Sequence, residues 1–252
     1  MFDLTGKVAL ITGAGQGVGL GIARQLGLQG ASVVVNDIHH DRATFAVGRL
    51  AEEGLANVSA AVFDVSDRQA VVESLLAVSN EVGPIDILVN NAGIPATGVM
   101  GLTPFRDENP EHWTDFFDVN AYGPLNCAHA VLAGMRDRGW GRIITIASGA
   151  HTGVGIGVSI YGASKGAGVS FARCLALEEA RSGITANVVS LGLIDRDEGF
   201  SDLSDRMAKS IPIGRIGQPD DVGHLVVYLA SEESSFLTGQ TLHLNGGSYL
   251  GT

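Results

Sequence analysis

The chain of 252 residues is 45% hydrophobic and carries a formal net charge of −11. This length and apolar content suffice for one sizeable core, whereas the acidic balance disfavours non-specific nucleic-acid binding and docking to an anionic membrane. The first apolar run, 8–12, is too short for a signal peptide or a membrane span. We therefore expect a cytoplasmic protein with no nucleic-acid or membrane partner.

Two cysteines, Cys127 and Cys174, lie in apolar, helix-like segments. We expect both to be buried free thiols rather than a disulfide or metal ligands. His39 and His40 are adjacent, but neighbouring residues after a strand rarely converge on one ion, and no third ligand is evident. The sequence thus predicts no metal site.

Short apolar segments without polar alternation recur along the chain, as expected of buried parallel strands. They cover 8–12, 32–37, 58–64, 85–89, 142–147, 184–189 and 240–244. Helical patterns separate them, over 18–29, 41–53, 67–82, 126–138, 161–181 and 220–230, with a further helix beginning near 109. Ser66 or Asp67 and Asn109 stand where N-caps are expected.

The regular alternation of strand and helix continues without a linker, a repeat or a low-complexity tract. Such alternation predicts a parallel sheet that is covered on both faces. We therefore expect a single α/β domain over residues 1–252, a Rossmann-type, doubly wound parallel sheet of seven strands with helices on both faces.

A glycine-rich turn, 12–19, separates the first strand from its helix. Glycines let the backbone approach a pyrophosphate closely, and the helix N-terminus offers free N–H groups and a positive dipole end. The common G-x-G-x-x-G spacing does not fit, but G-x-x-x-G-x-G fits Gly13, Gly17 and Gly19. A tight strand–helix turn would also need glycine. We expect this loop, with Gln16 and Val18, to bind a dinucleotide.

The second strand ends at Asp37, shortly after this loop. A carboxylate there can accept hydrogen bonds from the adenosine ribose hydroxyls and repels a 2′-phosphate, which favours NAD over NADP. A helix-capping role is the alternative. Together, the loop and the acid predict NAD (NAD⁺/NADH) as cofactor.

Tyr161 and Lys165 are four residues apart, so on a helix both side chains lie on one face. A nearby ammonium favours the ionised phenol and lowers the pKa of a tyrosine from about 10. The pair is therefore a candidate general acid/base for an alcohol oxygen. A solvated surface contact is the alternative.

Taken together, these motifs resemble those of the short-chain dehydrogenases/reductases, and the resemblance extends from residue 7 to 247. Similar members include NAD-dependent secondary alcohol dehydrogenases and 3-oxoacyl-ACP reductase-like proteins. The resemblance implies further cofactor contacts from Asp64, Val65, Asn91, Ala92 and Gly93. It implies a catalytic tetrad at Asn120, Ser148, Tyr161 and Lys165.

The family's chemistry implies a role for each residue of this tetrad. Ser148 follows a strand and would hydrogen-bond the substrate oxygen, while Tyr161 would exchange the proton. Lys165 would lower the tyrosine pKa and bind the nicotinamide ribose, and Asn120 would hold a water that links Lys165 to bulk solvent. A strand-end turn residue at Ser148 and a helix-kink residue at Asn120 are the alternatives.

After the sixth strand the chain departs from the family's usual Pro-Gly-hydrophobic-Thr pattern. Leu191 replaces the proline, which predicts a looser turn, and Arg196 stands where threonine is common. Gly192 and Ile194 remain, and Ile194 is expected to contact the nicotinamide carboxamide through its backbone.

Two further regions are expected near the substrate. The segment around 193–215, whose charges lie mainly in 195–209, is expected to form a lid, with a solvated helix face as the alternative. In the connection between 94 and 109, Met100, Leu102 and Phe105 either line the substrate pocket or pack against that lid. His151 either faces the substrate or is a loop residue.

The sequence therefore predicts an NAD(H)-dependent oxidoreductase that interconverts a small-molecule secondary alcohol and a ketone. A 3-oxoacyl-thioester reductase, acting on an ACP or CoA thioester, stays open, although Asp37 argues against NADPH. A non-catalytic NAD(H) sensor or a methyltransferase would not need the Tyr161 and Lys165 pair. The helices at 126–138 and 161–181 carry many small residues and more apolar surface than one core contact needs, and by resemblance they imply a homotetramer.

Overall fold

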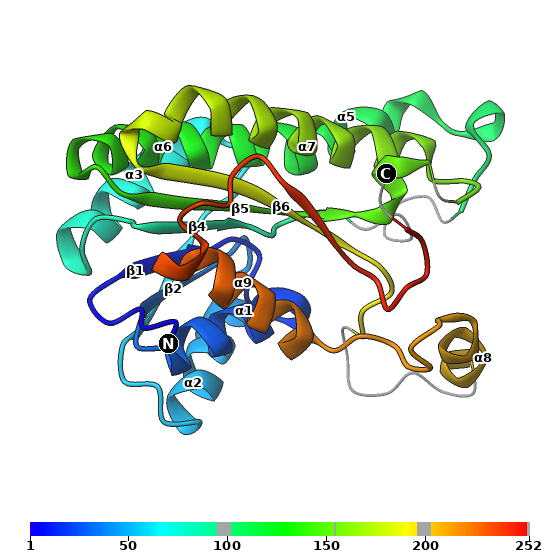
Figure 1. Ribbon diagram of the computed structural model, residues 1–252. Coiled ribbons are helices and arrows are strands. Elements are labelled where there is room, and N and C mark those ends of the chain that lie inside the picture. Colours follow the sequence, from blue (N-terminus) through cyan, green and yellow to red (C-terminus); the bar gives the residue numbers. More distant parts are fainter. Residues whose placement is uncertain (95–101, 154, 196–202, 251–252) are drawn as a thin grey trace.

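The computed structural model describes residues 1–94, 102–153, 155–195 and 203–250, and its centre is a parallel sheet of seven strands (Figure 1). The strands are β1 Val8–Ile11, β2 Ser32–Asp37, β3 Val58–Val62, β4 Ile87–Asn90, β5 Gly141–Ser148, β6 Ile184–Leu191 and β7 Thr241–Leu244. Their spatial order is β3-β2-β1-β4-β5-β6-β7. The predicted doubly wound, single-domain α/β fold is confirmed.

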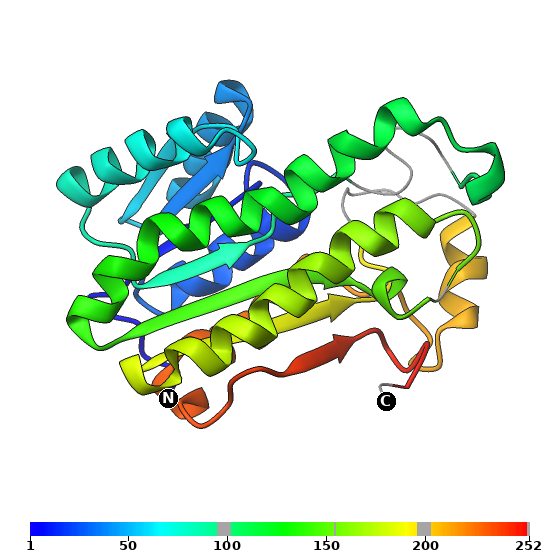
Figure 2. The same ribbon diagram turned by 90° about the horizontal axis from the view of Figure 1, so that it is seen from above.

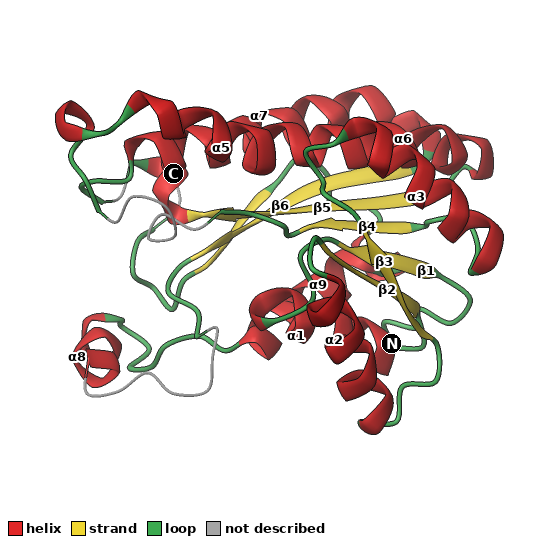
Figure 3. Ribbon diagram, turned by 180° about the vertical axis from the view of Figure 1, so that it is seen from behind, coloured by secondary structure: helices red, strands yellow, loops and turns green. Residues whose placement is uncertain are grey.

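Helices cover both faces of the sheet (Figures 1 and 2). One layer contains α1 Gly17–Leu28, α2 His40–Glu52 and α9 Pro219–Ala230, and the opposite layer contains α3 Arg68–Glu81, α6 Gly123–Arg138 and α7 Ser159–Glu179. The short helices α5 Trp113–Phe117 and α8 Leu203–Ser210 lie beyond the carboxyl ends of the strands (Figure 3). Both short helices therefore lie at the edge of the sheet where parallel α/β folds bind ligands.

The first strand of the chain is apolar throughout because each of its faces meets a layer of helices. In β1, Ala9 and Ile11 pack into one apolar cluster and Val8 and Leu10 into the other. Burial of each large aliphatic side chain contributes about 1.5–3 kcal/mol. A substitution in β1 that does not fit its cluster therefore destabilises the strand that leads into the glycine-rich loop.

The two cysteines differ in their surroundings. Cys127 is buried on α6, and burial raises the pKa of its thiol to about 12. Cys174 on α7 is exposed, so the expectation of two buried thiols is wrong for this residue. The buried face of α7 is occupied here by Ala172, Leu175 and Ala176, and helical spacing turns Cys174 away from it.

The helix expected to begin near 109 is divided into several pieces. Asn109 does act as a cap, because its Oδ1 accepts a hydrogen bond from the Glu111 N–H at 3.1 Å. A 3₁₀ turn, Pro110–His112, leads into α5, and a π-helical turn, Asp118–Tyr122, then connects α5 to α6. Widened turns of this kind recur at functional sites, and this one contains Asn120.

Candidate active site

A cleft of about 1130 Å³ opens at the carboxyl ends of the strands. It lies where the strand order reverses between β1 and β4, the usual ligand position in doubly wound sheets. All the cofactor-binding residues predicted from the sequence line it: Gly13, Gln16, Gly17, Val18, Gly19, Asp37, Asp64, Val65, Asn91, Ala92, Gly93, Tyr161, Lys165 and Ile194. Ser148 lines it as well, whereas Asn120 is buried behind its wall.

The glycine-rich loop forms an open cradle at the start of α1. Gly13 and Gly17 adopt φ of +62° and +55°, a left-handed conformation that favours glycine. Gln16 precedes the helix in an extended conformation, and among the described residues no side chain caps this end and no acid occupies the first turn. The first N–H groups of α1 are thus available to an anion.

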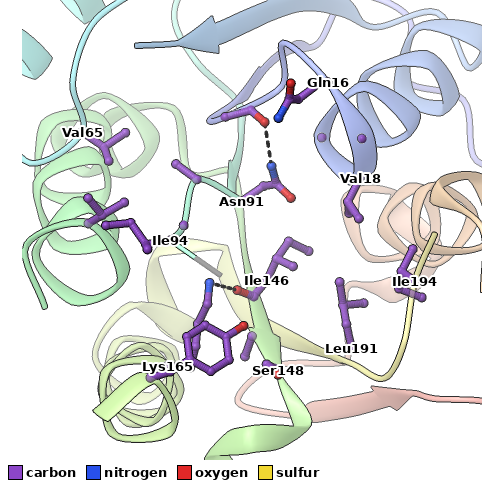
Figure 4. Close-up of a pocket in the computed structure, with 18 of the residues that line it drawn as sticks. Gln16, Val18, Val65, Asn91, Ile94, Ile146, Ser148, Lys165, Leu191 and Ile194 are labelled. Carbon is purple, nitrogen blue, oxygen red and sulfur yellow. Dashed lines mark hydrogen bonds between the residues drawn. The ribbon is translucent and has the colours of Figure 1, made fainter. Parts of the chain in front are cut away.

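The loop after β1 is joined to the loop after β4 by hydrogen bonds at the switch point. The N–H groups of Asn91 and Ala92 both donate to Thr12 Oγ1 at 3.0 Å. The Asn91 side chain donates back to the carbonyls of Thr12 and Gly13 at 2.9 and 3.1 Å, and Figure 4 draws one bond from this side chain. A Cβ on Gly19 would lie 2.6 Å from Asn91 Nδ2, so only glycine fits beside it.

Asp37 lies at the end of β2 and is 5% exposed. Its Oδ1 accepts a hydrogen bond from the His39 N–H at 3.0 Å, while its Oδ2 lies over Gly15, 2.5 Å from where a Cβ would stand. Arg42 of α2 lines the same part of the cleft. A carboxylate and a guanidinium group thus line the same part of the cleft.

Further along the cleft wall, the end of β3 is held by neighbouring side chains. Asp64 Oδ1 accepts hydrogen bonds from the N–H and hydroxyl of Ser66 at 2.8 and 2.7 Å. Asn126 of α6 donates to the Val65 carbonyl at 3.0 Å. Asp64 and Val65 therefore present a fixed edge to the cleft.

Across the cleft, Lys165 and Ser148 stand at the opposite end from Gln16 and Val18 (Figure 4). Lys165 is 8% exposed, and its Nζ donates to the Ile146 carbonyl at 3.2 Å. Tyr161 comes from the turn before it on α7 and packs edge-on against Phe116, with ring centroids 6.3 Å apart. The Ala150 N–H donates to Ser148 Oγ at 3.3 Å, which leaves the serine proton available to a ligand.

Asn120 supports this end of the cleft from beneath. Its Oδ1 accepts from the Ile94 N–H at 3.0 Å, and its Nδ2 donates to Ser164 Oγ at 3.0 Å. Ser164 in turn donates to the Tyr161 carbonyl at 2.8 Å. The side chain of Asn120 therefore connects the loop after β4 to the α7 turn that carries Tyr161.

The segment after β6 is held from two sides despite Leu191 in place of proline. Gly192 N–H donates to the Leu244 carbonyl at 2.9 Å, and Asp195 N–H donates to the Gly217 carbonyl at 2.8 Å. Ile194 is 7% exposed and pairs with Gly217 in an isolated bridge. These bonds position Leu191 and Ile194 on the cleft wall.

Some expected substrate residues lie elsewhere. Leu102 and Phe105 are exposed, and Phe105 stacks on Trp113 at 5.5 Å rather than lining the cleft. His151 is not among the residues that line the cleft either. It is a loop residue, the alternative named above, and its Nδ1 contacts the Ser148 carbonyl at 2.6 Å. Met100, Arg196 and residues 197–202 of the expected lid lie outside the described residues.

Other cleft residues were not singled out by the sequence. Many follow a strand directly, including Ile38 after β2 and Gly149 and Ala150 after β5, and that position is a usable signal. Tyr249 also lines the cleft, but it follows the last strand in a glycine-containing turn with no motif around it. Only the tertiary structure brings it to Ser148.

Comparison with known proteins places the chain in a family. A family model described as enoyl-(acyl carrier protein) reductase matches residues 13–249. An acetoacetyl-CoA reductase from Shinella zoogloeoides is 37% identical over 247 residues, which cover 96% of this chain and 98% of the relative.

Two solved structures are similar over almost their whole length. A gluconate 5-dehydrogenase from Burkholderia cenocepacia J2315, in complex with NADP and tartrate, has a TM-score of 0.89 and 37% identity and covers 98% of this chain and 96% of its own. A 3-oxoacyl-[acyl-carrier protein] reductase from Brucella melitensis with bound NAD has a TM-score of 0.90 and 30% identity, with 99% and 94% covered.

The chain belongs to the short-chain dehydrogenase/reductase family. It is an oxidoreductase of CH–OH and keto groups that uses a nicotinamide cofactor and a small-molecule substrate. In the part of the chain that the structure describes, no helix is both long and apolar enough to cross a membrane.

Proposed function

We propose that the protein is an NAD(H)-dependent oxidoreductase that interconverts a secondary alcohol and a ketone. The observation that carries the proposal is the meeting of Ser148, Tyr161 and the buried Lys165 in one cleft with the glycine cradle of α1. A proton-transfer group and a phosphate-binding loop in one cleft are what hydride transfer to a carbonyl requires.

The residues of the cleft fit a dinucleotide. The cradle offers uncapped N–H groups at a helix N-terminus, and Gly13 and Gly19 leave no room for a Cβ. A volume of about 1130 Å³ exceeds the roughly 300–1,000 Å³ of ordinary small-molecule sites. Gln16 to Gly19 would hold the pyrophosphate, Asp37 the adenosine ribose, Asp64 and Val65 the adenine, and Lys165 and Ile194 the nicotinamide end.

Each catalytic side chain has a distinct task in this proposal. The bound nicotinamide supplies or accepts the hydride. Tyr161 gives a proton to the carbonyl oxygen during reduction and takes it back from the alcohol during oxidation. Ser148 donates a hydrogen bond from its hydroxyl to the same oxygen, keeps its own proton, and stabilises the charge that develops there. The Lys165 cation favours the ionised phenol.

The preference for NAD rests on Asp37. Its carboxylate is buried at the end of β2, and in this proposal it accepts from the ribose hydroxyls of the cofactor and repels a 2′-phosphate. Arg42 lines the same region and could pair with such a phosphate, and the solved relatives hold NADP in one case and NAD in the other. We favour NAD because Asp37 lies directly over Gly15 of the loop.

Asp37→Ala is expected to weaken NADH binding by about 10- to 100-fold, the value of lost hydrogen bonds to a charged group. NADPH binding should improve because the repelling charge is gone. Fluorescence titration with both cofactors measures the two affinities. Asp41→Ala, an equal charge change on the exposed start of α2, is the control, and an unchanged NADH/NADPH ratio in Asp37→Ala would contradict the assignment.

The activity itself is tested by following NAD⁺ reduction at 340 nm across secondary alcohols and 3-hydroxyacyl thioesters, with the reverse reaction on ketones. We expect turnover of at least one alcohol–ketone pair. Firm NADH binding without turnover of any compound would instead support a cofactor-sensing protein.

A 3-oxoacyl-thioester reductase is the second candidate. It is supported by the names of two relatives, an acetoacetyl-CoA reductase and a 3-oxoacyl-[acyl-carrier protein] reductase. Preferred turnover of 3-oxoacyl thioesters over simple ketones in the same assay would establish it.

Assembly, lid and location stay predictions. Exposed apolar side chains on α6 and α7, Leu125 and Leu177 among them, support a homotetramer of 26.1 kDa chains, and a monomer mass in solution would contradict it.

The segment around 193–215 is proposed as a substrate lid. Cytoplasmic location remains an expectation from the sequence, and recovery of the native protein in a membrane or periplasmic fraction would contradict it.

A further inference from the structure

Behind the catalytic serine, four polar side chains from different segments form a connected cluster. His151 follows β5, Ser190 lies in β6, His243 lies in β7, and Tyr249 lies in the turn beyond it. The His151 and His243 rings stack at 6.0 Å, and His243 meets the Tyr249 ring edge-on at 5.1 Å. The proposed hydride and proton transfer uses none of these four side chains.

Tyr249 is held by one contact to its backbone and one to its hydroxyl. Its carbonyl accepts from Asn245 Nδ2 at 2.8 Å, and its hydroxyl lies 3.2 Å from Ser190 Oγ. A Cβ on Gly149 would stand 2.5 Å from the phenol oxygen. The hydroxyl therefore lies directly against the residue that follows Ser148, and Tyr249 lines the same cleft.

The donors and acceptors of this cluster can be assigned. The Ser148 carbonyl can only accept, so His151 Nδ1, at 2.6 Å, must carry the proton between them. His151 Nδ1 then cannot accept from Ser190, whose Oγ is 3.4 Å away. Ser190 is fully buried, and among its contacts with the described side chains only the Tyr249 oxygen can take its proton.

This assignment leaves the proton of Tyr249 available for a ligand. The phenol oxygen accepts from Ser190, so its own O–H points to another acceptor. Burial lowers the pKa of His243, with smaller contributions from the charges of His151 and Arg173, and this shift favours the uncharged ring beside Tyr249. The Tyr249 hydroxyl thus offers a hydrogen-bond donor to the cleft beside Gly149, the residue that follows Ser148.

We propose that Tyr249 is a substrate-binding residue whose hydroxyl donates a hydrogen bond to a second oxygen of the substrate. The substrate class would be carbonyl compounds that carry a further hydroxyl, carbonyl or carboxylate oxygen a few bonds from the reacting carbon. This inference rests on the proposed function, since it takes Ser148 and Tyr161 to mark the reacting carbonyl.

The test compares Tyr249→Phe with wild type on 4-hydroxybutan-2-one and pentan-2-one. These ketones have nearly the same shape and differ by a hydroxyl in place of a methyl group. The KM for the hydroxyketone should rise about tenfold in the variant, as expected for one lost hydrogen bond. The KM for pentan-2-one, the kcat for both and the affinity for NADH should stay unchanged. Tyr228→Phe is the matched control, because the Tyr228 ring packs on Phe2 outside the cleft.

The possible outcomes separate the inference from the proposed function. Equal shifts for both ketones, or none, would overturn the role of Tyr249 while ketone reduction stands. If wild type reduces no carbonyl compound, the proposed function fails, and calorimetric titration of NADH-loaded protein with tartrate decides instead. Tartrate binding weakened about tenfold by Tyr249→Phe would support the role of Tyr249, and equal or absent binding would refute it.

Discussion

Tyr161→Phe is expected to lower kcat by about 10²–10⁴-fold, the usual contribution of a positioned general acid/base. The change removes only the phenol oxygen, so the ring keeps its edge-on contact with Phe116 at 6.3 Å. Lys165 keeps its bond to the Ile146 carbonyl, and the glycine cradle is unaffected. NADH affinity should therefore stay within about twofold of wild type, because the lost phenol oxygen is not one of the main contacts to the cofactor.

The measurement pairs steady-state turnover with a fluorescence titration of NADH. Tyr228→Phe again controls for the loss of a tyrosine hydroxyl elsewhere in the fold. Turnover close to wild type in Tyr161→Phe would refute proton transfer by this residue. Loss of NADH binding together with turnover would show that the phenol acts mainly in holding the cofactor.

Gly93→Ala is the second change with a large expected effect. An added Cβ would lie 2.8 Å from both Asn120 Oδ1 and Lys165 Nζ. Neither atom is free to move away, because Asn120 Oδ1 accepts from the Ile94 N–H and Lys165 Nζ donates to the Ile146 carbonyl. A displacement on the order of 1 Å at a catalytic group lowers turnover by about 10²-fold.

The fold should survive this substitution. Gly93 does not have a positive φ, so alanine adds crowding but no backbone strain, and overpacking costs about 1–3 kcal/mol. Urea unfolding and kcat should both be measured. Gly48→Ala on the exposed side of α2, where a Cβ meets nothing within 4 Å, is the control and should raise stability by about 0.5–1 kcal/mol. A kcat for Gly93→Ala equal to that of Gly48→Ala would contradict the tight packing at Lys165.

Local patterns were enough to predict most of the fold and much of the cleft. The apolar runs, the turn glycines and the cap at Asp67, which accepts from the N–H groups of Gln69 and Ala70, are each set by a few neighbouring residues. The four-residue spacing of Tyr161 and Lys165 also predicts their common face without any tertiary information. Such features depend on contacts close in sequence.

Other features depend on contacts between distant segments, and sequence reasoning was incomplete for them. Asn120 was predicted as a tetrad residue with a helix kink as the alternative, and the structure places it in a π-helical turn with side-chain bonds to Ile94 and Ser164. Leu102 and Phe105 were expected either to line the substrate pocket or to pack against the lid, and in the structure they lie against Gly157 and Trp113. Cys174 was expected to be buried, but the way α7 lies on the sheet leaves it exposed.

The sequence by itself determined the order of strands and helices, the glycine-rich loop, the acid at the end of β2 and the spacing of Tyr161 and Lys165. The tertiary structure alone decided that Asp37 lies over Gly15, that Lys165 is anchored on Ile146, and that Tyr249 lies against Gly149 in the cleft that Ser148 also lines. The physical reason is that local propensities act over a few residues. Ser148 and Tyr249 are instead brought together by the parallel pairing of β5, β6 and β7, in which Ser190 stands opposite both Ala147 and His243.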